Sequence, residues 1–176
     1  MNDIAKRLAQ RLFNQRLIGN QYRSDFIEEM IRPVLSKTGW TFAGADWGGW
    51  DFEREADEKR LELKQSAAEQ VWSKPRGLRT RGAFDIASRT GHYSEHASKW
   101  EVAPGRPAHV YVFAWNGVEG EKADHRDSAQ WEFHVVKTSD LPRKQKTITL
   151  YRVRKLADPV PLAGLAKAVD EVLTHG

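Results

Sequence analysis

Three charged residues, Asp51, Glu62 and Lys64, have the types and spacing that suit hydrolytic chemistry at a phosphate group. Carboxylate oxygens are good ligands for a hard divalent cation such as Mg²⁺, which keeps several waters and pairs readily with phosphate. A bound metal lowers the pKa of its water, and a nearby lysine can orient that water or stabilise the charge that develops at phosphorus. These residue types therefore predict metal-assisted phosphoryl chemistry, provided that the fold brings them together.

Two segments with alternating apolar and polar residues, 50–53 and 60–64, are expected to form neighbouring strands. The charged run between them, 54–59, is expected to be a hairpin loop. Because side chains two residues apart share one face of a strand, Glu62 and Lys64 point to the same side. The leucines of the second strand then point to the other side, toward a core.

The register of this hairpin decides whether Asp51 joins the two charged residues of the second strand. In an antiparallel pair, directly opposed residues share a face. Burying Phe52 on the same side as Leu61 or Leu63 requires the numbers of paired residues to sum to 113 or 115. Either register places Asp51 on the charged face, whereas a slip of one residue would break the apolar and the polar grouping at once.

A bare acid-x-Lys triplet is a weak signal, since about one is expected by chance in a chain of this composition. A second triplet, Asp57-Glu58-Lys59, lacks apolar alternation and falls in the predicted loop. The triplet at 62–64 carries more weight because a helix and then Asp51 precede it. The alternative interpretation is an exposed sheet face covered with salt bridges.

A helix is predicted over about 22–37, where apolar residues recur at helical spacing. Ser24 suits the N-cap of this helix, and Gly39 closes it. Pro33 lies inside the pattern, so a kink or a break is expected near Arg32.

The series of Asp51, ten further residues and the acid-Leu-Lys triplet at 62–64 resembles the PD-(D/E)XK nuclease superfamily. The helical segment 24–40 is similar to the first helix of Holliday-junction-resolvase-type members. The resemblance covers roughly residues 22–66, with Trp50 in place of the proline that commonly precedes the aspartate. It implies an α/β domain of the restriction-endonuclease-like fold, in which helices flank a mixed central β-sheet.

The resemblance also implies roles for individual residues. Asp51 and Glu62 would ligate Mg²⁺, for which Mn²⁺ is a substitute, and Lys64 would be the catalytic lysine. Gln65 matches a polar position that several branches of the superfamily have directly after the lysine.

In the Holliday-junction-resolvase-type members, an acid eleven residues before a helix-ending glycine adds a carboxylate to the metal site. Glu28 stands at that distance from Gly39, so the resemblance implies that Glu28 is an auxiliary catalytic acid and a further metal ligand. On a helical wheel Glu28 borders the apolar stripe, whereas Glu29 faces nearly away from it. Glu29 is therefore the reserve candidate.

Positive charge is concentrated in two tracts. The chain has 28 Lys and Arg against 24 Asp and Glu, a net charge of +4, and residues 74–106 alone carry an excess of four. Residues 142–155 hold six Lys and Arg and no acid. Such tracts indicate a side that faces a polyanion, although solvated surfaces give the same pattern. Four arginines of the first tract, a predicted long functional loop, are expected to neutralise DNA phosphates: Arg76, Arg79, Arg81 and Arg89.

Aromatic and histidine residues near the first tract add two weaker hypotheses. Trp72 and Trp100 flank it and are candidates for stacking on unpaired bases. His92 and His96 would share a face of a helix and could hold a metal, although a histidine pair in such a loop is more often surface decoration.

The remaining elements complete a single domain over 1–176, with an N-terminal helix within residues 1–20. The apolar segment 109–115 is expected to be a central strand, and 66–73 could begin a short helix. Further expected elements are strands at 40–43, 131–136 and 147–151 and a closing helix over 162–173. This order of elements favours a mixed sheet flanked by helices.

Composition excludes several other classes of protein. No apolar run approaches the ~18 residues of a membrane span, and the absence of cysteine excludes disulfides, thiolate metal sites and a cysteine nucleophile. A cytoplasmic location is expected. The main hypothesis is a Mg²⁺-dependent endonuclease that acts on DNA, with a homodimer expected for cleavage of both strands. Two alternatives stay open: a non-catalytic nucleic-acid-binding module of the same fold, and an interaction subunit of a DNA repair or defence assembly.

Overall fold

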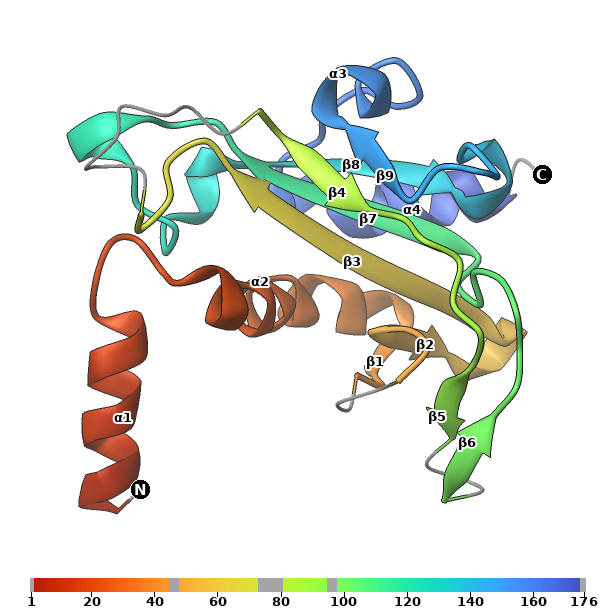
Figure 1. Cartoon of the computed structure of the whole chain (residues 1–176), viewed down its shortest axis with the longest axis horizontal. Helices are drawn as coiled ribbons and strands as arrows, with labels where there is room; N and C mark the ends of the chain where they lie inside the picture. The colour runs from red at the N-terminus through yellow and green to blue at the C-terminus, as the bar shows by residue number, and fades with distance from the viewer. Residues whose placement is uncertain (1, 45–47, 73–80, 95–97, 175–176) are drawn as a thin grey trace.

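The computed structural model describes residues 2–44, 48–72, 81–94 and 98–174. Its centre is a five-stranded sheet with the strand order β1-β2-β3-β7-β8 (Figure 1). β3 and β7 run parallel, and the other neighbours are antiparallel. The strands are β1 (Thr41–Phe42), β2 (Phe52–Arg54), β3 (Lys59–Ala67), β7 (Val110–Asn116) and β8 (Trp131–Lys137). A mixed sheet flanked by helices confirms the predicted α/β class.

Two layers cover this sheet. One face packs against the helices α2 (Asn20–Leu35) and α4 (Leu165–Thr174). The other face is covered by a two-stranded sheet and a short helix, which are β4 (Ala83–Asp85) with β9 (Thr147–Thr149) and α3 (Leu150–Val153). Each layer buries its own apolar cluster against the central sheet, so side chains on both faces of β3 and β7 are enclosed.

β7 occupies the central position that the apolar segment 109–115 predicts. All seven of its residues are buried. A strand with hydrogen-bonded neighbours on both edges and apolar layers on both faces needs a nearly continuous apolar sequence. The prediction that the apolar segment 109–115 forms a central strand is therefore confirmed.

The N-terminal helix α1 (Asp3–Phe13) lies within residues 1–20, as expected. α2 begins earlier than the sequence predicts, because Gly19 is its N-cap. Ser24 is therefore inside α2 and is not its N-cap. Its hydroxyl donates to the carboxylate of Glu28, one turn further along the helix, at 3.3 Å.

Pro33 neither ends α2 nor breaks it near Arg32, because the helix continues to Leu35. A proline removes one backbone donor of the helix, while the buried residues on either side of it keep their packing against the sheet. A 3₁₀ turn, Ser36–Thr38, follows, and Gly39 closes it with a φ of 84°. This left-handed conformation favours glycine, so the predicted stop is confirmed.

Two strand predictions need correction. β3 continues through Ala67, so the short helix expected to begin at 66 is absent there. The predicted strand 147–151 ends at Thr149, where α3 begins. β9 pairs with β4, which lies far away in the sequence, and these two strands form a separate sheet.

In the tract 74–106, predicted as a long loop, the described residues 81–94 and 98–106 include strands. Besides β4 it supplies a hairpin of β5 (His92–Ser94) and β6 (Lys99–Glu101). This hairpin projects from the body of the molecule, and α1 projects from its other end (Figure 1). Within the described ranges, no helix is long and apolar enough to cross a membrane.

A buried histidine ties the α1–α2 connection to the β7–β8 connection. Nδ1 of His125 accepts a hydrogen bond from the N–H of Ile18 at 3.0 Å, and Nε2 lies 3.2 Å from the carbonyl oxygen of Glu69. Because Nδ1 accepts, the ring is neutral and its proton is on Nε2. Burial lowers the pKa of His125 to about 4, and the positive charge of Arg23 acts in the same direction.

Candidate active site

The β2–β3 hairpin has one of the two registers that the sequence allows. Phe52 pairs with Leu61, so the numbers of paired residues sum to 113. Phe52, Leu61 and Leu63 are buried in the cluster that packs against α2. Glu62 therefore points to the opposite face, and Asp51, which directly precedes β2, lies close enough to Glu62 to raise its pKa.

Asp51 is held at the start of β2 by two contacts with β3. Its N–H donates to the carbonyl of Leu61 at 3.0 Å, and its Oδ2 accepts from the N–H of Leu63 at 2.6 Å. Burial raises the pKa of Asp51 to about 6, against the hydrogen bond from Leu63, and the negative charge of Glu28 raises it further. The carboxylate is thus fixed in position, and its ionised form is poorly solvated.

Glu62 and Lys64 form an ion pair on the same face of β3. Lys64 Nζ donates to Glu62 Oε1, and the two side chains are 25% and 16% exposed. Burial and the charge of Asp51 raise the pKa of Glu62 to about 7, although Lys64 opposes this. Burial disfavours the charge on Lys64, but the neighbouring carboxylates outweigh burial and raise the pKa of Lys64. Lys64 is therefore a protonated donor at neutral pH.

Glu28, on α2, contributes a third carboxylate to this group of charges. Burial raises the pKa of Glu28, and the charges of Asp25 and Glu62 raise it further. Glu29 is not a member, because it pairs with Arg32 at 2.8 Å on the exposed side of the helix. The structure therefore prefers Glu28 over the reserve candidate, as the helical wheel indicates.

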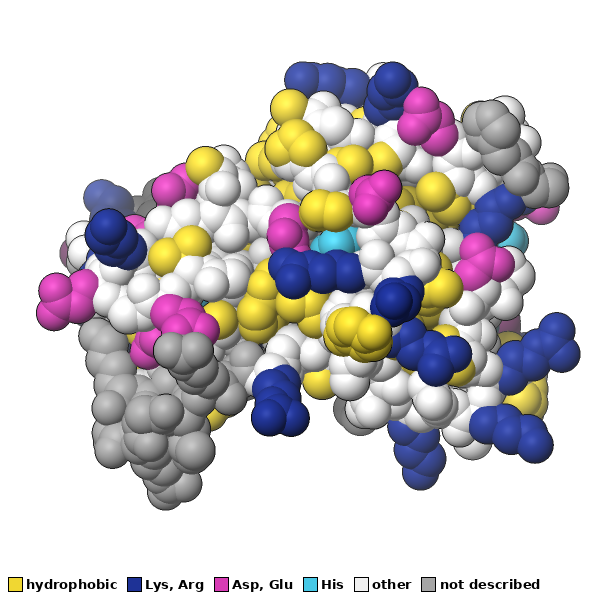
Figure 2. All heavy atoms as spheres, turned by 90° about the horizontal axis from the view of Figure 1, so that it is seen from above, with side chains coloured by type: hydrophobic (Ala, Val, Ile, Leu, Met, Phe, Trp, Pro, Cys, Tyr) yellow, Lys and Arg dark blue, Asp and Glu magenta, His cyan; other side chains and the backbone are white. Residues whose placement is uncertain are grey.

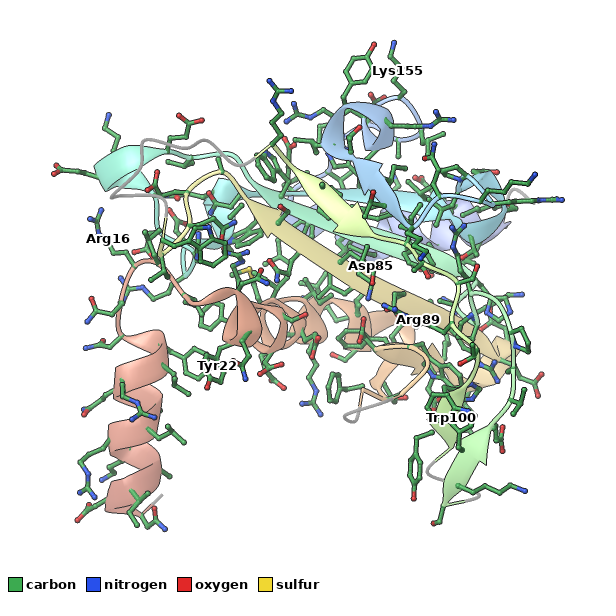
Figure 3. All side chains as sticks on the ribbon, viewed as in Figure 1. Arg16, Tyr22, Asp85, Arg89, Trp100 and Lys155 are labelled. Atoms are coloured by element: carbon green, nitrogen blue, oxygen red, sulfur yellow. The ribbon has the colours of Figure 1, made fainter. Side chains whose placement is uncertain are left out.

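Asp85, on β4, is a member of the site that the sequence analysis missed. It forms an ion pair with Arg89, and the two side chains lie together over β3 (Figure 3). Burial would raise the pKa of Asp85, but the N–H of Ala87 and the charge of Arg89 outweigh it and lower the pKa. The charge of Asp85 helps to raise the pKa of Lys64, and that of Arg89 opposes the rise in the pKa of Glu62.

A cavity of about 20 Å³ lies between these groups. Glu62 and Lys64 form one wall, Asp85 and Arg89 form another, and Tyr111 closes it from β7. A volume of this size holds about one water molecule. The sequence gives a weak local sign of this strand, because the apolar residues Phe84 and Ile86 flank Asp85, but nothing local indicates that the strand covers β3.

Gln65 contacts a different set of residues. It follows the alternation of β3 to the α2 side, where its Oε1 accepts from Arg23 Nε at 2.6 Å. The guanidinium of Arg23 is buried and also donates to Gln70 and Asn20, at 2.8 and 2.7 Å. Gln65 thus satisfies a buried cation, and no described contact joins it to the carboxylate group.

The predicted DNA-binding and stacking residues are only partly described. Arg81 is exposed, whereas Arg76 and Arg79 lie outside the described residues. Trp72 and Trp100 are exposed, as stacking requires. His92 lies on a strand and not on a helix, against the ring of Trp50, and its proposed partner His96 lies outside the described residues.

The fit of these residues to a metal depends on how many carboxylates the metal needs. Within the described part of the chain, no three His, Asp or Glu side chains come close enough together to form a metal-binding group. Mg²⁺, however, commonly uses one or two protein carboxylates and completes its shell with water and phosphate. Asp51 and Glu62 meet that requirement, and the raised pKa of each is what neighbouring buried carboxylates show without a cation. The donor set therefore fits a water-rich Mg²⁺ site and does not fit an all-protein cage.

Comparisons of the chain with protein-family models, with curated proteins and with solved structures return no match.

Proposed function

We propose that this protein is a divalent-metal-dependent phosphodiesterase, an endonuclease that hydrolyses the DNA backbone, as its resemblance to the PD-(D/E)XK nucleases implies. The observation that carries the proposal is the grouping of Asp51, Glu62 and Lys64 on one face, produced by the pairing of Phe52 with Leu61. The buried carboxylates, the lysine and an adjacent small cavity are the parts that metal-assisted attack of water on a phosphodiester requires.

Asp51 and Glu62 would hold Mg²⁺, or Mn²⁺ as a substitute. The bound ion would supply an activated water and would screen the charge that builds at phosphorus. Both carboxylates must be ionised to bind a cation, and the pKa values of about 6 and about 7 mean that free protein holds protons there in mildly acidic solution. Metal binding is thus favoured as the pH rises above 7.

Lys64 acts in this proposal as a donor and as a fixed positive charge. Its ammonium donates to Glu62, and the raised pKa keeps it protonated. When a cation offsets the charge of Glu62, the ammonium can donate to the attacking water or to an oxygen of the phosphate, where charge develops. Lys64 is therefore not the base in this mechanism.

Two further groups would complete the reaction. Glu28 has a raised pKa and neighbours the charge of Glu62, so it can accept a proton from the water or help to hold a second cation. Arg89, at the opposite wall of the cavity, would neutralise a flanking phosphate together with Arg81 and the expected contacts Arg76 and Arg79.

The test is nicking of supercoiled plasmid and of branched DNA with and without Mg²⁺ or Mn²⁺. Asp51→Asn keeps the acceptor for the Leu63 N–H but removes the charge, and Glu29→Gln is the matched control on the exposed side of α2. Metal-dependent nicking by wild type and by Glu29→Gln, with loss in Asp51→Asn, supports the proposal. Nicking by Asp51→Asn at the wild-type rate removes the site from consideration.

One observation favours the second candidate, a non-catalytic nucleic-acid-binding module. The Lys64–Glu62 ion pair already neutralises one of the two carboxylates, so a cation must compete with an internal partner. A binding module would retain DNA affinity in Lys64→Ala and would show no metal-dependent cleavage in any form. Nucleic-acid affinity falls steeply with added salt. Measuring affinity at several salt concentrations therefore distinguishes the nuclease and the binding module from a subunit that contacts only protein.

A homodimer is part of the nuclease proposal. One site cuts one strand at a time, and two symmetry-related sites allow both strands of a duplex to be cut in one encounter. Light scattering of the protein with and without duplex DNA measures this directly.

A further inference from the structure

A groove with a volume of about 790 Å³ lies along β9 and α3, on the side of the molecule opposite to the β5–β6 hairpin. Its lining includes Lys146, Thr149, Tyr151, Arg152 and Lys155. Figure 2 looks down on this side and shows Lys and Arg side chains grouped around hydrophobic ones. These residues belong to the second basic tract, 142–155, for which the proposed catalytic mechanism has no use.

Three cations of this groove are not neutralised by a carboxylate in the part of the chain that the structure describes. Among the described residues, Lys146, Arg152 and Lys155 form no ion pair, whereas Arg154 of the same tract pairs with Glu132. All three are exposed. Three positive charges without an ion-pair partner around one concave surface attract a polyanion. If the polyanion is a nucleic acid, binding is also favoured by the release of the counterions condensed on its phosphates.

The exposed ring of Tyr151 favours single-stranded over double-stranded nucleic acid as the ligand of this groove. Tyr151 is 74% exposed at the groove, and Lys155 Nζ lies 5.2 Å from the centre of its ring. A ring that is left this accessible on a basic surface is a platform for an unpaired base, because stacking tolerates any sequence and complements contacts to the backbone. Bases within a duplex are already stacked on each other and cannot use it.

The groove adjoins the candidate active site. Thr147, at the groove, pairs with Asp85, at the cavity beside Lys64. Arg106 lines that cavity, and its guanidinium donates to the carbonyl of Gln145, which lines the groove, at 3.1 Å. In Figure 3, Lys155 stands on the α3 side, and Asp85 lies below it, beside Arg89. A polynucleotide in the groove would therefore lie beside β4, the strand that carries Asp85.

We propose that the β9–α3 groove binds a single-stranded polynucleotide, with Lys146, Arg152 and Lys155 on successive phosphates and Tyr151 stacked on a base. The biological meaning of this inference rests on the proposed nuclease function. The substrate class would then be DNA with an unpaired segment next to the cleaved phosphate, such as a tail or a flap.

Binding is measured by the fluorescence anisotropy of a labelled 20-nucleotide oligothymidylate in EDTA, where no metal-dependent cleavage occurs. The groove variant combines Lys146→Gln, Arg152→Gln and Lys155→Gln. The matched control combines Lys6→Gln, Arg7→Gln and Arg11→Gln, which removes the same charge from the exposed surface of α1. We expect the groove variant to bind about ten-fold or more weakly at low salt, with a salt slope smaller by about 2, and the control to stay within about two-fold of wild type.

The ring is tested separately. Tyr151→Ala weakens binding by about five-fold or more, and Tyr151→Phe retains it, since stacking needs the ring and not the hydroxyl. Equal affinities of the groove variant and the α1 control overturn the proposal. Competition by duplex DNA or by polyglutamate as effective as that by oligothymidylate also overturns it, in favour of a duplex or of an acidic protein. Binding through the groove without any Mg²⁺-dependent cleavage refutes the nuclease function alone.

Discussion

The carboxylate of Asp51 accepts a hydrogen bond of 2.6 Å from the backbone N–H of Leu63. The bond joins the residue that directly precedes β2 to the middle of β3, where Leu63 lies between Glu62 and Lys64. Leu63 itself points into the core. The same residue therefore packs the apolar cluster with its side chain and orients the candidate metal ligand with its backbone.

Asp51→Asn should stabilise the protein at alkaline pH. Folding raises the pKa of Asp51 from an ordinary value of 3.8 to about 6. The native state thus binds more protons than the unfolded state between these values, and stability falls as the pH rises through this window. Asparagine removes the buried charge but keeps an acceptor for Leu63, so we expect a gain of roughly 1–3 kcal/mol at pH 8.

Denaturant unfolding in EDTA at pH 8 and at pH 4 measures this gain. At pH 4 the difference between Asp51→Asn and wild type should be much smaller, because the wild-type carboxyl is largely protonated there. A difference that is the same at both pH values would show that the charge of Asp51 is not the destabilising element.

Magnesium should stabilise the wild type and leave Asp51→Asn unaffected. A ligand that binds only the native state at ten times its dissociation constant adds about 1.4 kcal/mol. The increase should be larger at pH 8 than at pH 5.5, because Asp51 and Glu62 must lose protons to bind the cation. Melting temperatures in a Mg²⁺ titration test this, with Na⁺ at equal ionic strength as the control. Equal stabilisation of both proteins would place the cation elsewhere.

Lys64→Met should reduce metal-dependent cleavage without reducing DNA affinity. The methionine keeps the packing of the side-chain stem but removes the donor that contacts Glu62. We expect cleavage to fall by about 10² or more, as for the loss of one donor to a developing charge. The exposed Lys37 provides the matched control, Lys37→Met. Initial nicking rates and anisotropy in EDTA are measured on both, and parallel losses of binding and cleavage would argue for a role in affinity alone.

His125 should make the protein less stable in mild acid. Its pKa falls from an ordinary 6.5 to about 4 in the folded protein, so the unfolded state binds more protons between these values. The stability that neutral His125 contributes is present above pH 6.5 and is lost as the pH falls toward 4. His125→Gln keeps an acceptor for the N–H of Ile18 but cannot be protonated.

Urea unfolding of His125→Gln between pH 4.5 and pH 8 tests this. We expect a loss of about 1–2 kcal/mol at pH 8, from poorer packing and hydrogen bonding, and a weaker dependence on pH below 6.5 than in wild type. An unchanged dependence would assign the acid sensitivity to other groups.

The sequence by itself determined the local geometry of the site. Alternation in the β2–β3 hairpin limited the pairing of Phe52 to Leu61 or Leu63, because any slip by one residue would expose the apolar side chains, and the structure selects Leu61. The continuous apolar run of β7 indicated its central place, and Gly39 marked the end of the first core helix because only glycine adopts its φ of 84° without strain.

Tertiary structure alone decided which distant residues meet these elements. Asp85 and Arg89 join the site because β4 pairs with β9 across the sheet. Alternation turns Gln65 away from the site, but only the fold supplies its partner there, Arg23 on α2. The groove at β9 and α3 arises from the same pairing. A local pattern of apolar residues predicts which face of a helix or strand is buried, but not which other element covers that face. The covering element is decided by contacts between segments far apart in the sequence, and such contacts produce no repeating pattern of residues.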